Sequence, residues 1–451
     1  MEERHRRLLH KQNPLWAGEK LRTPTFKRDL FNTLGDYLGY KQIIAINGLR
    51  RVGKTTLMKQ LIEILPESVE SNNICYISFD DRDFQKYETA DDLINYFMQF
   101  SNTGGKRYLF LDEIQKVPDW PHLLKTYYDL GDDLKIIISG SSSIELKKYK
   151  ETLAGRIITL NLPILTFGEF ARYFGMDCKV DIGSANEYDT KILPIKDKYF
   201  LLFHEYLVKG AFPELLEIGE ADFIKRYISE SVVEKVVADL SREIKPEREN
   251  IVYELLRIFS RNTAQPFEIT TLSNALGVNR NIMSRYVGLL EKAFLIKTAY
   301  NFTASVVKQV RMSKKAYIAH SSIALSLLDY PPDTVNFEEM NIGHLVESVI
   351  MGSLPNASFW RTPQKDEVDI IINGKKPLPI EVKYKNNITR KDMKGILKFM
   401  DRFGVNEGII ITKDLFKTED MKTSKTEDLK TIRYVPAWLF LLADHNPARS
   451  T

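Results

Sequence analysis

Cysteine is almost absent from this chain of 451 residues, which contains only Cys75 and Cys178. Two cysteines this far apart form neither a disulfide framework nor the closely spaced pairs of a zinc site. The cysteine content therefore fits a protein of a reducing cytosol.

Long hydrophobic runs are lacking as well. No apolar stretch approaches the roughly 20 residues that a membrane-spanning helix needs. The N-terminal stretch MEERHRRLLHKQNPLWAG is charged and has no apolar core, so it is not a signal peptide. We therefore expect a cytoplasmic protein without a membrane segment.

A strong excess of one charge is also missing, because the net charge is only +4. So small a balance neither requires nor excludes nucleic acid as a partner, and local clusters of basic residues matter more than the sum. The apolar share of 43% and the charged share of 27% are ordinary for a soluble globular protein. The length allows two to four domains.

The strongest motif that is present is a glycine-rich loop in the stretch KQIIAINGLRRVGKTTL. A β-rich run over 43–46 leads into the loop, and a helical pattern over 55–65 follows it. The spacing is that of a P-loop. There, backbone N–H groups and the helix N-terminus bind phosphates, the lysine reaches the β- and γ-phosphates, and the hydroxyl after it ligates Mg²⁺. The expected ATP-binding residues of the loop are Gly48, Arg50, Arg51, Val52, Gly53, Lys54, Thr55 and Thr56.

Two later strands end in polar residues that suit the same site. The stretch RYLFLDEIQ predicts a buried strand followed by Asp112 and Glu113. Asp112 should hold the Mg²⁺, and Glu113 should orient and polarise an attacking water, which favours hydrolysis over a kinase transfer. The stretch LKIIISGSSS places Ser139 or Ser141 where it could sense the γ-phosphate. A simple exit from the strand is the alternative for either serine.

Strands that alternate with helical stretches predict a doubly wound α/β domain with a parallel sheet. Arg156 lies at a loop-to-strand junction just after these motifs. It is a candidate arginine finger that would reach a nucleotide in its own chain or in a neighbouring subunit. A structural or solvated arginine is an equal alternative.

Six stretches, in this order, are GLRRVGKTTL, YLFLDEIQ, IISGSSS, LAGR, LPILTFGEF and GAFPELLE. From about Gln12 to the C-terminus the chain resembles a large family of prokaryotic AAA-type ATPases with a C-terminal domain of unknown function. The resemblance implies ATP hydrolysis but little about a substrate. It also implies an acidic residue near the end of KKAYIAHSSIALSLL, where Ala319 and His320 stand instead, and we assign His320 no role.

The middle of the chain predicts a helical lid over 166–245 and a winged-helix domain over 246–320. Helices over 270–276 and 280–292 flank a turn at Gly277, and FLIKTAY would be the first strand of a wing. A recognition helix with basic flanks suits the DNA backbone. The candidate DNA-binding residues are Arg280, Asn281, Arg285, Lys314 and Lys315. Winged helices also serve as protein–protein adaptors, and this alternative stays open.

The last segment, 335–451, combines a helix that carries Glu347 with a hairpin whose turn is Asn373–Gly374. Strand parity puts Glu381 and Lys383 on one face, with Asp369 beside them on the partner strand. This arrangement resembles the restriction-endonuclease-like PD-(D/E)XK nuclease fold. The resemblance implies that Glu347, Asp369 and Glu381 hold Mg²⁺ or Mn²⁺ and that Lys383 positions water. A retained fold used for binding or autoregulation is the rival interpretation.

Together these patterns predict an α/β protein with a P-loop AAA-type core over 1–165, a helical lid, a winged helix and a nuclease-like domain. The leading hypothesis is an Mg²⁺-dependent ATPase that acts on DNA. The alternative is a nucleotide-dependent switch whose C-terminal domains bind a protein partner without cleaving nucleic acid. A homo-oligomer is compatible with both hypotheses.

Overall fold

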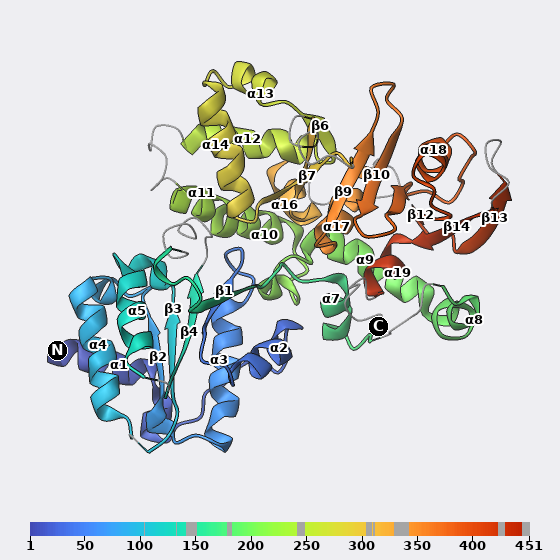
Figure 1. Ribbon diagram of the computed structural model, residues 1–451. Coiled ribbons are helices and arrows are strands. Elements are labelled where there is room, and N and C mark those ends of the chain that lie inside the picture. The colour runs from blue at the N-terminus through green and yellow to red at the C-terminus, as the bar shows by residue number, and fades with distance from the viewer. Residues whose placement is uncertain are drawn as a thin grey trace. The chain divides into compact units, whose positions relative to one another are not determined.

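Figure 1 shows the protein as a computed structural model, which divides into two compact units, Met1–Ile164 and Leu165–Thr451. The structure describes residues 1–102, 104–131, 133–140, 151–177, 183–240, 249–303, 309, 312–328, 342–422 and 429–443. Ser141, one of the two candidate phosphate sensors, lies outside these residues. Within the described residues, none of the helices combines the length and the apolar character that crossing a membrane requires.

The first unit is built on a five-stranded parallel sheet in the order β2-β3-β4-β1-β5. Its strands are β1 (Ile43–Asn47), β2 (Ile74–Ser78), β3 (Arg107–Asp112), β4 (Leu134–Gly140) and β5 (Ile157–Asn161). The three central strands are buried along nearly their whole length, which is typical of parallel strands covered on both faces. The α/β fold with a parallel central sheet, predicted from the sequence, is confirmed.

Helices cover both faces of this sheet (Figure 1). They are α1 (Glu3–Gln12), α2 (Leu30–Tyr37), α3 (Lys54–Ile64), α4 (Tyr87–Phe100) and α5 (Trp120–Asp129). α1, α4 and α5 lie on one side, and α2 and α3 lie on the other. Because all five strands are parallel, the carboxyl ends of β1, β3 and β4 meet at one edge, where ligands of such sheets bind.

The second unit begins with helices. They are α7 (Phe167–Tyr173), α8 (Ala185–Glu187), α9 (Lys196–Lys209), α10 (Ala221–Arg226) and α11 (Glu234–Leu240). A capping box starts α7: Thr166 Oγ1 accepts the Glu169 N–H at 3.1 Å, and Glu169 Oε2 accepts the Thr166 N–H at 3.0 Å. The segment expected to form a lid is thus helical where it is described, and its role as a lid stays a prediction.

A three-stranded antiparallel sheet with three helices follows. The elements are α12 (Glu249–Arg261), β6 (Gln265–Phe267), α13 (Ile269–Ala275), α14 (Arg280–Lys292), β7 (Ile296–Tyr300) and β8 (Lys314–Ile318). The strand order is β6-β8-β7. Asn279 caps α14 by accepting the Ile282 N–H at 2.9 Å. The two helices and the strand after them lie where the sequence pattern placed them.

The C-terminal part is a six-stranded mixed sheet in the order β13-β14-β12-β11-β10-β9. Its strands are β9 (Ala357–Arg361), β10 (Glu367–Ile372), β11 (Leu378–Val382), β12 (Glu407–Thr412), β13 (Lys417–Lys422) and β14 (Leu429–Pro436). β9, β10 and β11 are antiparallel neighbours, whereas β12 is parallel to β11. The helices near this sheet are α16 (Ser321–Leu327), α17 (Gly343–Ser353), α18 (Lys394–Phe403) and α19 (Ala437–Leu442).

Helix α18 packs closely on one face of this sheet, and α17 and α19 pack on the other (Figure 1). The apolar side of α18 carries Ile396 and Phe399 into a core that includes Trp360. A β-carbon at Gly395 would lie 1.9 Å from the Glu367 carbonyl oxygen, so only glycine allows this approach. The contact fixes the backbone of β10, which carries two of the charged residues described below.

Candidate nucleotide site and a buried ion-pair cluster

The loop between β1 and α3 has an unusual backbone. Gly53 has a φ of +97° and Arg51 a φ of +68°, and the latter is uncommon for a residue with a side chain. Left-handed residues among right-handed ones turn successive N–H groups toward one point, which forms an anion-binding concavity. A β-carbon at Gly48 would lie 2.3 Å from the Leu162 carbonyl oxygen. Glycine is therefore required at position 53 by the backbone conformation. At position 48 it is required because a β-carbon has no space.

Lys54 is the first residue of α3 and is buried. Its ammonium donates to the carbonyl oxygens of Gly48 at 3.1 Å and Leu49 at 3.0 Å. The charge is therefore held inside the loop, at the N-terminus of a helix, where both favour a phosphate. Thr55 and Thr56 follow on the first turn of the same helix.

Asp112, at the end of β3, is where side chains from four elements meet. Its Oδ2 accepts hydrogen bonds from Thr55 Oγ1 at 2.6 Å and from the Tyr76 hydroxyl at 2.9 Å. Its Oδ1 accepts a hydrogen bond from the Ser139 hydroxyl on β4. The structure thus brings together Thr55, Asp112 and Ser139, which the sequence placed in one site. Tyr76 was missed because it stands in an apolar strand, where an aromatic residue is typical of a core.

The environment of Tyr76 makes its hydroxyl a donor. Burial, together with the Asp112 carboxylate, raises the pKa of Tyr76 above its ordinary range. The hydroxyl stays protonated at neutral pH and orients the carboxylate.

Glu113 follows Asp112 with a left-handed φ of +56°. Burial raises the pKa of Glu113, and the Asp112 carboxylate adds to this effect, while the Lys54 ammonium opposes it. Its Oε2 accepts a hydrogen bond from Gln115 Nε2 at 2.5 Å. A carboxylate held in this way beside the phosphate loop can orient a water molecule.

Thr55 and Asp112 fit a magnesium ion. A hydroxyl and a carboxylate offer the hard oxygen ligands that Mg²⁺ prefers. Their oxygens already converge to 2.6 Å from different elements of the sheet edge. No rearrangement of the backbone is needed to present both to one cation.

Arg156 lies far from this loop within its own unit. It directly precedes β5, and its carbonyl accepts the N–H of Ile43 at the beginning of β1. The P-loop begins at the other end of β1. A strand rises about 3.3 Å per residue, so the backbone at Gly48 is about 16 Å from that at Ile43. The guanidinium pairs with Asp129, with Nε–Oδ1 at 2.9 Å. The prediction that Arg156 reaches the nucleotide of its own chain is therefore wrong, because the residue is at the amino edge of the sheet.

Arg28 is a structural part of the site that the sequence did not reveal. It is buried, and its Nη1 donates to the Val52 carbonyl of the phosphate loop at 2.6 Å. Its Nη2 donates to the carbonyl of Pro163 at 2.8 Å. It ties the loop to the segment after β5. Nothing in the sequence pattern around this arginine, TFKRDL, predicts the contact.

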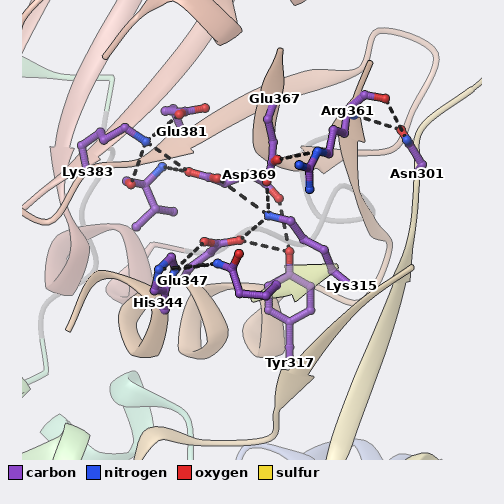
Figure 2. A network of polar contacts seen from close by, with 12 residues as sticks. Asn301, Lys315, Tyr317, His344, Glu347, Arg361, Glu367, Asp369, Glu381 and Lys383 are labelled. Carbon is purple, nitrogen blue, oxygen red and sulfur yellow. Dashed lines mark hydrogen bonds and ion pairs between the residues drawn. The ribbon is translucent and has the colours of Figure 1, made fainter. Parts of the chain in front are cut away.

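A second group of charged side chains lies together in the second unit, where Lys315, Glu347 and Glu381 are buried and the other members are partly exposed (Figure 2). We call it the Lys315 cluster, and its members are Lys315, Glu347, Glu367, Asp369, Glu381 and Lys383. Lys383 Nζ donates to Glu381 Oε1 at 2.6 Å and lies 3.6 Å from Asp369 Oδ2. Asp369 Oδ2 also accepts the Val382 N–H at 2.9 Å. The hairpin residues Asp369, Glu381 and Lys383 are thus neighbours.

Lys315 corrects one of the DNA-binding predictions. Its side chain is only 1% exposed, and its Nζ lies 2.6 Å from Glu367 Oε1 and 3.2 Å from Glu347 Oε1. The distance to Asp369 Oδ1 is 3.9 Å. Alternation along β8 turns Lys315 inward, so this residue cannot contact a DNA phosphate.

The two remaining carboxylates of the expected metal site are those of Glu347 and Glu381. The sequence left open whether Glu347 is a metal ligand or a solvent-exposed residue. The side chain is buried and also accepts a hydrogen bond from the Tyr317 hydroxyl at 3.1 Å. Burial and the nearby Asp369 raise the pKa of Glu381 to about 8, although Lys383 opposes this. Among the described residues, Glu381 Oε2 has no hydrogen-bond partner although it is buried. The donor set of Glu347, Asp369 and Glu381 does not fit a divalent ion in this arrangement. The Lys315 ammonium already lies beside Glu347 and Asp369, and the Lys383 ammonium donates to Glu381.

The remaining DNA-binding candidates are on the surface. Arg280, Asn281 and Arg285 are exposed on α14. Lys314 has its Nζ 4.5 Å from the centre of the Tyr300 ring. Of the five candidates, only Lys315 is buried.

His320 has a structural role. It is the N-cap of α16, where its Nδ1 accepts the Ser322 N–H at 3.1 Å. An acidic residue, which the family resemblance led us to expect, would cap the helix in the same way. Burial lowers the pKa of His320 to about 3, so the ring is neutral at physiological pH.

Comparison with known proteins supports the assignment of the first site. The family described as "AAA domain" matches residues 40–171. This segment is therefore similar to AAA-type ATPase domains. Two families described as domains of unknown function (DUF8612 and DUF4143) match residues 201–334 and 336–434. The predicted resemblance to ATPases with C-terminal domains of unknown function is confirmed to this extent.

The whole proteins to which the chain is similar are described as uncharacterized. One from Methanocaldococcus jannaschii is 26% identical over 402 residues, which is 83% of this chain and 81% of its own. A second from the same organism is 27% identical over 374 residues, covering 78% and 76%. One from Haemophilus influenzae is 24% identical over 290 residues, covering 62% and 68%.

Two solved structures have weak overall similarity. Caenorhabditis elegans PCH-2 has a TM-score of 0.31 at 16% identity, over 45% of this chain and 63% of its own. The ORC1 protein of Aeropyrum pernix, solved in complex with DNA, has a TM-score of 0.30 at 12% identity, over 73% and 92%.

Proposed function

We propose that the protein binds ATP in the loop over 48–56 and hydrolyses it. The observation that carries this proposal is the convergence of Thr55, Ser139 and Tyr76 on the Asp112 carboxylate beside the buried Lys54. Bound Mg²⁺, held by Thr55 and Asp112, would neutralise phosphate charge. Lys54 would bind the terminal phosphates after leaving the two loop carbonyls.

Glu113 is the residue proposed to act on water. Its carboxylate lies next to the metal ligand and near the Lys54 ammonium, so it can orient a water molecule in line with the γ-phosphate and accept its proton. Ser139, which already contacts Asp112, is the proposed sensor of the γ-phosphate. Arg156 could contribute only to a nucleotide bound by a second copy of the chain, after leaving Asp129.

Two substitutions separate binding from hydrolysis. Lys54→Ala should abolish ATP binding and turnover, whereas Glu113→Gln should keep binding and lower turnover by at least about 100-fold. Turnover would be measured by phosphate release, and binding with a fluorescent ATP analogue. Lys20→Ala, which removes an exposed lysine of the same unit, is the control. Turnover by Lys54→Ala at the parent rate would contradict the proposal.

We further propose that the α12–β8 segment is a winged helix that contacts DNA. The order helix–strand–helix–helix–strand–strand supports this proposal, as does the exposure of Arg280, Asn281 and Arg285 on the second helix of the pair. The contacts would be with phosphates, which two arginines and Lys314 can reach. A protein partner at the same surface is the alternative, and the salt dependence of binding separates the two.

The C-terminal domain is proposed to have a nuclease-like architecture. The order α17–β9–β10–β11–α18–β12, with Asp369 and Glu381 on adjacent strands, supports it. Cleavage is not the function that this site supports best, because Lys315 pairs with the carboxylates that a metal would need. The rival interpretation, a retained fold used for binding or regulation, is favoured.

A further inference from the structure

We infer that the Lys315 ammonium takes the place of a divalent metal ion in the C-terminal carboxylate cluster, and that this cluster therefore binds neither Mg²⁺ nor Mn²⁺. The inference concerns a different unit from the ATP site and does not depend on ATP hydrolysis. It rests on the contacts of Lys315, on the charge balance of the cluster and on the strand that carries the lysine.

The contacts of Lys315 are those of a bound cation. Its Nζ lies 2.6 Å from Glu367 Oε1 and 3.2 Å from Glu347 Oε1, with Asp369 Oδ1 at 3.9 Å (Figure 2). These three carboxylates come from two different elements, the helix α17 and the strand β10. An ammonium has three N–H donors and no acceptor, so acceptors on several sides are what its burial requires.

The charges in the cluster are nearly balanced without a metal. Glu347, Glu367, Asp369 and Glu381 can contribute four negative charges, and Lys315 and Lys383 contribute two positive ones. A third positive charge comes from Arg361, whose Nε is 3.3 Å from Glu367 Oε2. A divalent ion added to this set would lie beside a buried ammonium and would be repelled by it.

The position of Lys315 is set by its strand. β8 is the central strand of its sheet, and Lys315 pairs with Pro266 on β6 and with Ala299 on β7. Tyr317, two residues along on the same face, donates to Glu347 Oε1 at 3.1 Å. The backbone of Lys315 is thus held on both sides, and the ammonium cannot leave the carboxylates by a shift of the strand alone.

The ion pairs of Lys315 also give the cluster a structural role. Lys315 belongs to the three-stranded sheet next to α14, whereas Glu367 and Asp369 belong to the six-stranded sheet. Their ion pairs connect the two sheets through buried contacts. Removing one partner would leave the others charged and unpaired, which is strongly unfavourable. The cluster therefore connects the two sheets, and Glu347, Asp369, Glu381 and Lys383 within it are the residues that in a nuclease would surround a metal.

Removal of the ammonium should create a metal site. In Lys315→Met, Glu347 and Asp369 would lose the ammonium between them, and Lys383 would be the cation left beside Asp369 and Glu381. The buried Glu381 Oε2, which has no partner among the described residues, would be available as a ligand. Methionine keeps the length of the apolar stem and removes the ammonium with its charge and its three N–H donors.

The experiment measures Mn²⁺ binding without nucleotide, by the loss of the free Mn²⁺ signal in electron paramagnetic resonance. The full-length parent and Asp369→Asn should bind Mn²⁺ equally weakly. Lys315→Met should gain one site at least about tenfold tighter than any site of the parent, and Lys315→Met with Asp369→Asn should lose it again. Lys314→Met, which removes the neighbouring lysine on the opposite face of β8, should gain nothing.

Two outcomes would overturn the inference. One is a Mn²⁺ site in the parent protein that disappears in Asp369→Asn. The other is a folded Lys315→Met protein that gains no site. If Lys315→Met does not fold, the comparison of the parent with Asp369→Asn still decides, because asparagine retains an oxygen that can accept the Val382 N–H. ATP turnover, measured in the same samples, should be unchanged by Asp369→Asn, so a failure of the ATPase proposal would be recognised separately.

Discussion

Thr55 Oγ1 donates a 2.6 Å hydrogen bond to Asp112 Oδ2, although 57 residues separate the two in the chain. The contact exists because β1 and β3 are parallel strands of one sheet, so the loop after β1 and the last residue of β3 reach the same edge. The hydroxyl of Tyr76, from the end strand β2, donates to the same oxygen at 2.9 Å. Together with the hydroxyl of Ser139 on β4, these contacts determine where the carboxylate proposed to bind the metal points.

Tyr76→Phe should raise the Mg²⁺ concentration needed for half-maximal ATP turnover by about fivefold. The substitution removes one hydrogen bond to the carboxylate, which corresponds to about 1 kcal/mol. Turnover would be followed during a Mg²⁺ titration at saturating ATP. Tyr108→Phe on β3 is the matched control, because its ring is similarly buried and it lies near the start of the strand that ends at Asp112. An unchanged Mg²⁺ requirement in Tyr76→Phe would show that the hydroxyl does not orient Asp112.

His320 should make the second unit less stable in weak acid. Its pKa is about 3 in the folded protein, compared with 6.5 for an ordinary histidine. Between these values the unfolded chain binds a proton that the folded chain does not, so stability falls as the pH decreases from 6.5 toward 3. The loss should approach about 1.4 kcal/mol for each pH unit.

The test is the variant His320→Asn, which removes the titrating ring and keeps an acceptor for the N-cap. The free energy of unfolding, measured in urea between about pH 6.5 and pH 5, should depend less steeply on pH in this variant than in the parent. His122→Asn, a change at an exposed histidine, should keep the parent slope. Equal slopes for the parent and His320→Asn would contradict the prediction.

The exposed arginines of α14 should govern DNA binding. Removing both in Arg280→Ala with Arg285→Ala should weaken binding at low salt by at least about tenfold, and the slope of log K against log salt should decrease by about 2. Binding of duplex DNA would be measured by fluorescence anisotropy at several salt concentrations. The control removes Arg6 and Arg7, which are exposed on α1 of the other unit. DNA binding that ignores both salt and these substitutions would instead favour a protein partner at this surface.

Gly395→Ala should destabilise the second unit by about 1–3 kcal/mol. The new methyl group would be 1.9 Å from the Glu367 carbonyl oxygen, so either α18 or β10 must move. The midpoint of urea unfolding would report the change. Gly219→Ala is the control, because a β-carbon there meets no atom within 4 Å. A midpoint equal to that of the parent would mean that the helix can shift at no cost.

The sequence alone was sufficient to predict the α/β fold and the proximity of Thr55, Asp112 and Ser139. The P-loop has a fixed spacing because phosphates need adjacent N–H groups and a helix N-terminus, and Asp112 and Glu113 end an apolar run that only a buried strand explains. Such local patterns can be recognised in the sequence without knowledge of the fold. The hairpin residues Asp369, Glu381 and Lys383 were also placed together, since strand parity and the turn signal set their relative positions.

Only the tertiary structure decided which residues from distant segments share an environment. Lys314 and Lys315 look identical in the sequence, yet one lies over the Tyr300 ring and the other is buried among carboxylates. The pairing of β8 with two neighbours determines which lysine faces inward, and the approach of α17 and β10 determines what it meets. Likewise, the sequence left open whether Arg156 reaches the nucleotide of its own chain, and the strand pairing puts it at the opposite edge of the sheet. The sequence shows which side chains carry a charge. Whether a charged side chain is removed from water, and which ion-pair partner it meets, depends on contacts between segments that are far apart in the chain.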